Sequence, residues 1–449
     1  MKKAKKFLYL FIILFFIQFI FIHTSFAVEN TNNLKIYSPS YILMEASTGK
    51  ILAENNPNEV MPPASTTKIM TAILTVENCK LDEIATVSHN AIFSVPPSYS
   101  IASLREGEEL TVEQLLNVLL IQSANDAANV LAEHIAGSVE EFAKMMNDKA
   151  KELGCKNTNF VNANGVEEDD HYSTAYDLAL MGKYAMQNST IRNIVTKTQY
   201  TLPKTNKYDK EDRIFNTTND LIREDYSDSK DNYYYEYANG LKTGYTTEAG
   251  SCIVATAKKD NLELIAVVLG GETTDDGLSE RNLDCITLFN YGFDNYKIEN
   301  VNKANDVVQQ IDVFGATADT QKLDVVVKND INLFLDKNTD ISQISPDIEL
   351  NNNLKAPISM GDTIGKISYN INDTTYSSDL IAGSSVYKSD ILSTIIKLLL
   401  AILALCLLFK LLKPYKSKSR KSSKSTSKRK KKSGKHSKNN TFRINKYLR

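Results

Sequence analysis

The chain has 449 residues, too many for one ordinary domain and enough for two or three with apolar cores of their own. All 54 Asp and Glu residues lie between Val28 and Asp390, so this body carries a net charge of about −24, and we expect it not to bind nucleic acid. The five cysteines and five histidines are scattered, which excludes a disulfide framework for so large a body and predicts no metal site and no cofactor.

Residues 1–27 have the pattern of an export signal peptide. Four lysines between positions 2 and 6 precede an apolar run from Phe7 to about Ile22. Ser25-Phe26-Ala27 then forms a cleavage site of the small-x-small type. A retained membrane anchor is the alternative interpretation. Either interpretation predicts that the body faces outward across the membrane.

The next stretch predicts a strand pair followed by a helix that carries a serine and a lysine. Residues 41–46 and 51–54 are β-type runs around a tight glycine turn, and apolar residues recur with helical spacing over 65–78. Ser65 and Lys68 then lie one helical turn apart, within reach of each other. The unpaired N–H groups of a helix N-terminus can stabilise an oxyanion there. Taken alone, the two residues are more simply a helix cap and a surface lysine.

Residues 111–137 predict two buried helices interrupted by a short polar hinge at 122–126. The first helix is apolar nearly all round, so we expect it to lie inside the protein. The hinge places Ser123 and Asn125 at a cavity wall, where polar groups need partners from the protein or from a ligand. A purely structural hinge is the simpler interpretation of these two residues in isolation.

The middle of the chain supplies loops and one further helix. Asn162–Gly165 is predicted to be a loop, and the acidic residues Glu167–Asp170 to be a solvated surface. A helix is expected to start at Ser173 or Thr174, with Thr174 and Asp177 spaced as in a capping box. Residues 216–219 indicate a turn to which we assign no chemistry.

Two glycine-flanked apolar runs, 239–257 and 264–269, predict adjacent antiparallel strands. The first run contains Lys242-Thr243-Gly244, where a glycine without a side chain would leave room for a ligand along the strand edge. Residues 281–291 then form an amphipathic helix that is expected to close the domain.

Together, Ser65-x-x-Lys68, Ser123-x-Asn125 and Lys242-Thr243-Gly244 resemble the motif set of class A β-lactamases and penicillin-binding proteins. Over residues 36–296 the chain is most similar to D-alanyl-D-alanine carboxypeptidases, the low-molecular-weight penicillin-binding proteins. The stretches 48–50 and 171–177 also resemble that family. The resemblance implies an α+β fold of the β-lactamase/transpeptidase type, with an antiparallel sheet flanked by helices and a helical subdomain.

The resemblance also implies roles for the first two motifs. Ser65 is expected to be the nucleophile and Lys68 its general base, provided that burial and the charge of Lys242 keep Lys68 neutral. Ser123 would pass a proton to the leaving amine. Asn125 would hold a substrate amide and orient Lys68. No metal or cofactor takes part in this chemistry.

For the third motif, the resemblance implies that Lys242 and Thr243 bind the terminal carboxylate of a D-Ala-D-Ala stem peptide of peptidoglycan. Gly244 belongs to the same substrate-binding strand. The backbone N–H groups of Tyr245 and of the serine would form the oxyanion hole. Arg281 is either a second cation for the carboxylate or an ordinary surface arginine. β-Lactams are expected to acylate the same serine.

Two rival functions remain to be compared with this one. A class A β-lactamase would carry an E-x-x-L-N motif between the second and third motifs, and this sequence has none there, although Glu167 and Glu168 lie in the interval. A catalytically silent peptidoglycan-binding scaffold is the other rival, and the three intact motifs argue against it.

The predicted organisation is therefore a signal peptide at 1–27 and a catalytic domain at 28–296. Residues 297–388 resemble the small β-sandwich appended to these carboxypeptidases, which would serve as a spacer or as a docking module. A transmembrane anchor follows at 389–412, because its 19-residue apolar stretch can just span a bilayer. A helix lying in the membrane surface is the alternative. Residues 413–449 hold sixteen Lys and Arg and no acid, which indicates a disordered cytoplasmic tail. Anionic lipid is its simplest partner, ahead of nucleic acid or a cytoplasmic protein.

Overall fold

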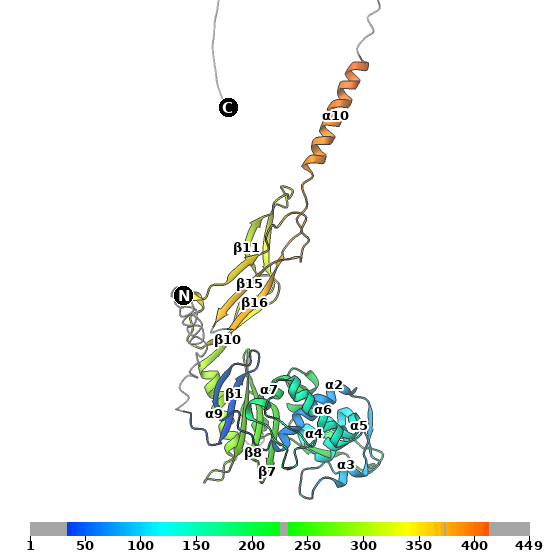
Figure 1. Cartoon of the computed structure of the whole chain (residues 1–449), viewed down its shortest axis with the longest axis vertical. Coiled ribbons are helices and arrows are strands. Elements are labelled where there is room, and N and C mark those ends of the chain that lie inside the picture. The colour runs from blue at the N-terminus through cyan, green and yellow to red at the C-terminus, as the bar shows by residue number, and fades with distance from the viewer. Residues whose placement is uncertain (1–33, 225–231, 372–373, 413–449) are drawn as a thin grey trace, which may run out of the picture.

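The computed structural model describes residues 34–224, 232–371 and 374–412 (Figure 1). It contains a domain of mixed helices and strands, then an all-β domain, then a single long helix at the opposite end of the molecule from the first domain. The predicted signal peptide and basic tail lie outside the described residues.

A five-stranded antiparallel sheet forms the centre of the first domain, in the order β2-β1-β9-β8-β7. Its strands are β1 (Ser40–Glu45), β2 (Ile51–Asn55), β7 (Ala238–Thr246), β8 (Gly250–Lys259) and β9 (Leu262–Gly271). Side chains alternate between its two faces, because Ile42 and Val267 join one buried core while Leu43 and Ala266 join another. Both faces of the sheet are therefore covered.

Helix α9 (Glu280–Asn295) packs on one face of the sheet, and α7 (Ala175–Ala185) packs on the other (Figure 1). Beyond α7 lies a helical subdomain made of α2 (Lys68–Asn78), α3 (His89–Phe93), α4 (Val112–Ile121), α5 (Asn125–Ala136), α6 (Val139–Glu152) and α8 (Ser189–Val195). Short elements complete it, namely η2 (Ala64–Thr67), η3 (Asp220–Ile222) and the strand pairs β3 (Ile84–Thr86) with β4 (Glu109–Thr111) and β5 (Gln199–Leu202) with β6 (Arg213–Asn216). The fold class inferred from the sequence is confirmed.

Two local predictions need correction. Ser65 does not lie in the α-helix itself, because residues 64–67 form the single 3₁₀ turn η2 from which α2 continues. At α7, only half of the expected capping box forms. The Thr174 side chain accepts the Asp177 N–H, but the Asp177 carboxylate binds the N–H groups of Lys156 and Asn157 instead of returning to the cap.

The all-β domain consists of two sheets around one apolar core. One sheet has the order β11-β12-β16-β15-β14, and β10 pairs with β13 in the other. The strands are β10 (Tyr296–Asn302), β11 (Val307–Asp312), β12 (Lys322–Val327), β13 (Ile331–Asp336), β14 (Asp347–Leu350), β15 (Thr363–Ile371) and β16 (Thr374–Ala382), with a 3₁₀ turn η5 (Ile341–Gln343). Within this domain Tyr296 stacks on Phe334 at 5.2 Å. Lys50 of the first domain lies over the Phe334 ring, so a cation–π contact joins the two domains.

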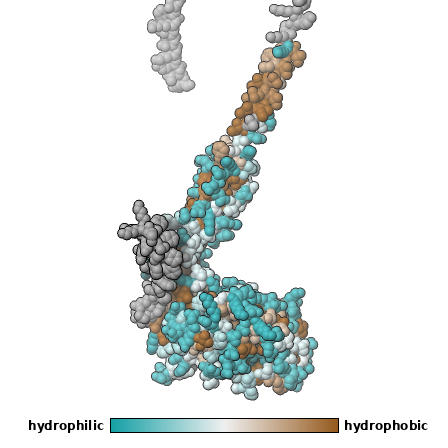
Figure 2. Space-filling view, viewed as in Figure 1, coloured by the Kyte–Doolittle hydropathy of each residue, from teal (hydrophilic) through white to brown (hydrophobic). Residues whose placement is uncertain are grey.

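Helix α10 (Ile391–Leu411) extends from the all-β domain. Its segment Ser393–Leu411 is long and apolar enough to cross a membrane, and none of it is buried inside the described structure. Figure 2 shows α10 as a hydrophobic column beside the largely hydrophilic surface of the all-β domain.

Candidate active site

A cleft of about 390 Å³ lies where the edge strand β7 meets the η2 turn and the hinge between α4 and α5. Its lining residues are Ser65, Ser98, Tyr99, Ser100, Ser123, Asn125, Thr218, Thr243, Gly244, Tyr245, Thr246, Thr247 and Arg281. Seven of the nine residues proposed from the sequence therefore line one cleft. The other two, Lys68 and Lys242, are buried next to it.

Strand β7 passes unusually close to the η2 turn, and Gly244 makes this possible. A Cβ at position 244 would lie 3.0 Å from the Ser65 nitrogen and 3.1 Å from the Thr66 nitrogen. The sequence suggested that this glycine clears space for a ligand. The structure gives a different reason, since the space is filled by the backbone of the serine turn. Gly244 thus sets the distance between Ser65 and strand β7.

A second glycine supports the same turn from behind. Gly165 has a φ of +80°, and a Cβ there would lie 1.9 Å from the carbonyl oxygen of Ala64. Only glycine fits at such a position. Ala64 itself has a φ of +47°, a left-handed conformation that costs a non-glycine residue free energy. The loop at 161–166 therefore holds the residue before Ser65 in a strained backbone conformation.

The Lys68 amine has three hydrogen-bond partners. Its Nζ lies 2.8 Å from Ser65 Oγ, 2.8 Å from Asn125 Oδ1 and 2.5 Å from the carbonyl oxygen of Asn164. The amide and carbonyl oxygens can only accept hydrogen bonds. A neutral amine has two N–H groups and one lone pair, so if both N–H groups go to these acceptors, the lone pair faces the Ser65 hydroxyl. This arrangement suits a general base.

The surroundings of Lys68 favour its neutral form. The side chain is fully buried, and this burial is the main cause that lowers its pKa well below the ordinary value. The charge of Lys242 lowers the pKa further, while the Asp126 carboxylate acts in the opposite direction. The sequence named Lys242 and burial together, and in the structure burial is the larger of the two.

Three residues on one face of α2 and η2 hold the 161–166 loop. Besides the Lys68 contact, Thr71 donates to the Ala163 carbonyl at 2.5 Å, and Thr67 Oγ1 lies 2.8 Å from His171 Nε2. Because His171 Nδ1 accepts the Val161 N–H, its Nε2 carries the proton and donates to Thr67. Burial, followed by the charge of Lys68, lowers the pKa of His171 to about 4, so this histidine is neutral at ordinary pH.

The α4–α5 hinge brings Ser123 and Asn125 to the cleft as predicted. Ser123 has a φ of +65°, again a left-handed conformation at the site. Asn125 Nδ2 donates to the Ser100 carbonyl at 2.8 Å. The adjacent Asp126 carboxylate accepts the N–H groups of Ala102 and Leu104. The hinge therefore also fixes the segment at 100–104, of which Ser100 lines the cleft.

Lys242 lies beneath the cleft rather than in its lining. Its Nζ donates to the Thr243 carbonyl at 2.7 Å, and burial, followed by the charge of Arg281, lowers its pKa to about 7. Arg281 is no surface arginine, since it lines the cleft and donates from Nη1 to the Gly244 carbonyl. Its buried Nε has no partner among the described residues. Arg281 is thus the cation that borders the cleft directly.

Several site residues were not identified from the sequence. Thr218, within the turn to which no chemistry was assigned, forms a 2.6 Å hydrogen bond between its hydroxyl and that of Thr243. Asn164 contributes a backbone carbonyl, which has no sequence signature. His171 belongs to a stretch that resembled the family, but nothing in the sequence indicated its contact with Thr67.

Among the described residues, no Asp or Glu lines the cleft. Glu167 and Glu168 are exposed, as expected for a solvated loop. The fold does gather one group of potential metal ligands, Cys79, Glu83 and His134, which sequence spacing had not suggested. His134 Nε2 lies 3.5 Å from the Glu83 carboxylate, and burial raises the pKa of Cys79, so a histidine–carboxylate contact beside a protonated thiol accounts for this group among the described residues.

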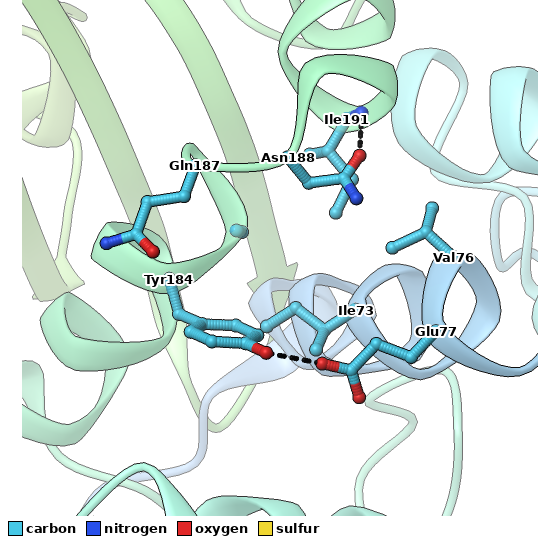
Figure 3. A pocket seen from close by; sticks show the side chains of 8 residues that line it. Ile73, Val76, Glu77, Tyr184, Gln187, Asn188 and Ile191 are labelled. Atoms are coloured by element: carbon cyan, nitrogen blue, oxygen red, sulfur yellow. Dashed lines mark hydrogen bonds between the residues drawn. The ribbon is translucent and has the colours of Figure 1, made fainter.

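A second hollow of about 210 Å³ lies between α2, α7 and α8 (Figure 3). Its apolar lining includes Ile73 and Ile191, and the Tyr184 hydroxyl donates to the Glu77 carboxylate at its rim (Figure 3). None of the candidate residues reaches this hollow. The nine residues proposed from the sequence therefore all lie in or beside the cleft at Ser65.

This chain is similar to known proteins over most of its length. A family model described as D-alanyl-D-alanine carboxypeptidase matches residues 26–273, and one described as the C-terminal domain of penicillin-binding protein 5 matches residues 296–388. The D-alanyl-D-alanine carboxypeptidase DacF of Bacillus subtilis is 36% identical over 346 residues, which cover 76% of this chain and 83% of the relative. The D-alanyl-D-alanine carboxypeptidase DacA of Escherichia coli is 29% identical over 351 residues, 76% of this chain and 81% of the relative.

Solved structures are similar over most of the chain. Penicillin-binding protein 5 of Haemophilus influenzae is 27% identical with a TM-score of 0.59, and the alignment covers 79% of this chain and 98% of that one. A peptidoglycan synthesis regulatory factor (PBP3) of Streptococcus pneumoniae is 25% identical with a TM-score of 0.64, covering 78% of this chain and 99% of that one. The similarity extends through both the mixed and the all-β domain.

Proposed function

This chain belongs to the D-alanyl-D-alanine carboxypeptidase family of serine peptidases, and we propose that it removes the terminal D-alanine of peptidoglycan stem pentapeptides through an acyl-enzyme on Ser65. One observation carries the assignment of the nucleophile. Lys68 Nζ lies 2.8 Å from Ser65 Oγ, while its other two partners are acceptors only. A buried lysine with such partners takes up the serine proton as the hydroxyl attacks.

In the acylation step, Ser65 Oγ attacks the carbonyl carbon of the penultimate D-alanine and Lys68 accepts its proton. The developing oxyanion receives hydrogen bonds from the backbone N–H groups of Ser65 and Tyr245. Asn125 keeps one Nδ2 hydrogen on the Ser100 carbonyl, which leaves the other for a substrate carbonyl.

Collapse of the tetrahedral intermediate breaks the peptide bond and releases D-alanine. The leaving amine takes a proton through Ser123, supplied by the Lys68 ammonium, which returns to the neutral form. Water then attacks the ester on Ser65 with Lys68 again as the base. Lys68 returns that proton to Ser65 Oγ as the ester bond breaks, and the trimmed peptide leaves.

The terminal carboxylate of the substrate binds at the Thr243 hydroxyl and the Arg281 guanidinium, both of which border the cleft. Lys242 contributes its charge from below, 2.7 Å from the Thr243 carbonyl. A free carboxylate beside the scissile bond is what distinguishes a carboxypeptidase substrate. Two cations at one end of the cleft therefore fit this specificity.

β-Lactams acylate the same serine in this scheme, as covalent inhibitors. The absence of any Asp or Glu from the described lining of the cleft argues against the rival β-lactamase function, since no carboxylate is placed to activate a deacylating water. Turnover of benzylpenicillin and of diacetyl-Lys-D-Ala-D-Ala distinguishes the two. We expect D-alanine release by the wild type and none by Ser65→Ala, with slow penicillin turnover. Rapid penicillin hydrolysis without D-alanine release would reverse the assignment, and neither reaction would favour a non-catalytic scaffold.

The same proposal places the catalytic domain outside the cell membrane, with α10 as the anchor and residues 413–449 in the cytoplasm, bound to anionic lipid. Its support is the apolar segment Ser393–Leu411 and the sixteen basic residues beyond it. Truncation after Asp390 should release an active body from the membrane fraction. Persistence of the truncated chain in membranes would show that the anchor lies elsewhere.

A further inference from the structure

The end of the all-β domain next to α10 exposes large apolar side chains. Phe314 is 76% exposed, Met360 71% and Tyr387 63%. They lie in three neighbouring segments, 313–321, 351–362 and 383–390, which follow or precede the strand ends on this side of the domain. In the described part of residues 297–388, Val307 is the one other large apolar side chain that is equally exposed. The exposed apolar surface of this domain is thus concentrated at one end.

Backbone hydrogen bonds tie these segments together. The Ala356 N–H donates to the Phe314 carbonyl at 3.0 Å, and the Thr317 N–H donates to the Tyr387 carbonyl at 2.9 Å. Ile358 and Val386 exchange both of their backbone hydrogen bonds. The three segments therefore form one surface, which we call the distal tip.

A very short connection joins the distal tip to α10. The Ser389 N–H still donates to the Gly315 carbonyl at 2.8 Å, and the helix begins at Ile391. The apolar span Ser393–Leu411 has 19 residues, which as a helix cover about the 30 Å thickness of the hydrocarbon core. The outer boundary of that core then falls near Ser393, and the distal tip follows within a few residues, at the depth of the lipid headgroups.

The net charge of the distal tip neither opposes nor favours its position at the lipid headgroups. The three segments carry two lysines, Lys355 and Lys388, and three aspartates, Asp319, Asp362 and Asp390. The distal tip is therefore nearly neutral, although the ectodomain as a whole is strongly acidic. Aromatic and other large apolar residues are favoured at the interface between lipid and water, irrespective of headgroup charge.

We propose that the distal tip inserts Phe314, Met360 and Tyr387 into the outer-leaflet interface of the membrane that α10 spans. This inference rests on the proposed anchoring by α10 and goes beyond it, since an anchor alone leaves the all-β domain free to tilt. Contact through three segments and the helix holds the domain upright. The cleft, in the domain at the far end of the molecule (Figure 1), is then kept at a fixed height above the bilayer, so the all-β domain acts as a spacer.

The chain contains no tryptophan, so a single substitution creates a unique fluorescent reporter. Full-length Phe314→Trp and Tyr387→Trp would be reconstituted into phosphatidylcholine vesicles with and without brominated acyl chains, which quench a tryptophan that contacts them. Phe93→Trp is the matched control, because Phe93 is 69% exposed on α3, at the other end of the molecule (Figure 1). Leu403→Trp, inside α10, reports insertion of the anchor.

We expect bromolipid to reduce the emission of Phe314→Trp and Tyr387→Trp at least twofold and to leave Phe93→Trp unchanged. The quenching should persist at high salt, because the contact is apolar. If Leu403→Trp is quenched while both tip reporters behave like Phe93→Trp, the inference is wrong and the anchor stands. If Leu403→Trp is not quenched either, the anchoring proposal fails and the tip contact fails with it.

Discussion

Replacement of Asn125 by aspartate tests whether Lys68 works as a neutral base. The substitution keeps the size and shape of the side chain but places a carboxylate where the amide oxygen now lies, 2.8 Å from Lys68 Nζ. At that distance and an effective dielectric constant of about 20, the attraction between a carboxylate and an ammonium amounts to about 6 kcal/mol. Even half of this energy shifts the protonation equilibrium of Lys68 by roughly 100-fold toward the ammonium.

The assay is the second-order rate constant of acylation by a fluorescent penicillin, measured between pH 5 and pH 10. In the wild type, burial and the charge of Lys242 lower the pKa of Lys68 well below its ordinary value, which favours the neutral amine. Asn125→Asp should therefore acylate slowly near neutrality and recover part of its rate at alkaline pH. Asn125→Ala is the control, because it removes the same hydrogen bond without adding a charge.

The pH profiles of the two variants separate charge from geometry. We expect Asn125→Ala to lose rate without an alkaline displacement of its profile. If Asn125→Asp keeps the wild-type profile, or if both variants show the same one, then the charge state of Lys68 does not limit acylation. That result would refute the role of Lys68 as the general base.

Four further predictions follow from the site. Lys242→Ala removes the second cause of the lowered Lys68 pKa, so acylation by penicillin should slow and its profile move to higher pH; an unchanged rate would contradict the electrostatic coupling. Because the Lys242 pKa is about 7, kcat/KM for a D-Ala-D-Ala peptide should decline above that pH as the charge of Lys242 is lost. Arg281→Gln should move this decline to a higher pH, because it removes a charge that lowers the Lys242 pKa. A decline at the same pH in the variant would exclude Lys242 as its source. Gly244→Ala would place a methyl group 3.0 Å from the Ser65 nitrogen and displace the nucleophile by a few tenths of an ångström. Acylation should slow by about 10- to 100-fold in a protein that still folds. Acylation at the wild-type rate would show that the turn tolerates the methyl group. His171 has a pKa of about 4 in the folded protein and about 6.5 in the unfolded chain. The free energy of unfolding should therefore fall by about 3 kcal/mol as the pH drops from about 6.5 to about 4. Urea titrations of His171→Gln should show a smaller fall.

Most of the site residues could be predicted from the short motifs, because their residue types are rare in combination and their spacing is local. Ser65 and Lys68 are one turn apart, and Ser123 and Asn125 share one hinge, so their proximity needs no tertiary information. Lys242 is far away in sequence and was placed only through the family resemblance. Its position beneath the cleft was not predicted, and the sequence left open whether Arg281 borders the cleft, because both depend on how α9 packs on the sheet.

The features that escaped the sequence are those made by backbone atoms or by contacts between distant segments. The Asn164 carbonyl binds Lys68 across 96 residues of sequence separation, and any residue type could supply such an oxygen. The sequence identified Gly244 but not why a glycine is required there, because the close approach of the η2 turn exists only in the folded chain. The strands and helices that were predicted lie close to the expected positions, since alternation and helical periodicity are local properties of the sequence, whereas α6 and α8 were not predicted.

Mass spectrometry of the penicillin-treated protein can identify the nucleophile itself. Folded protein would be incubated with benzylpenicillin, digested, and the adduct located by peptide fragmentation. We predict one penicilloyl group, on Ser65. A folded protein that takes up no adduct, or one that carries it on Ser123 instead, would contradict it.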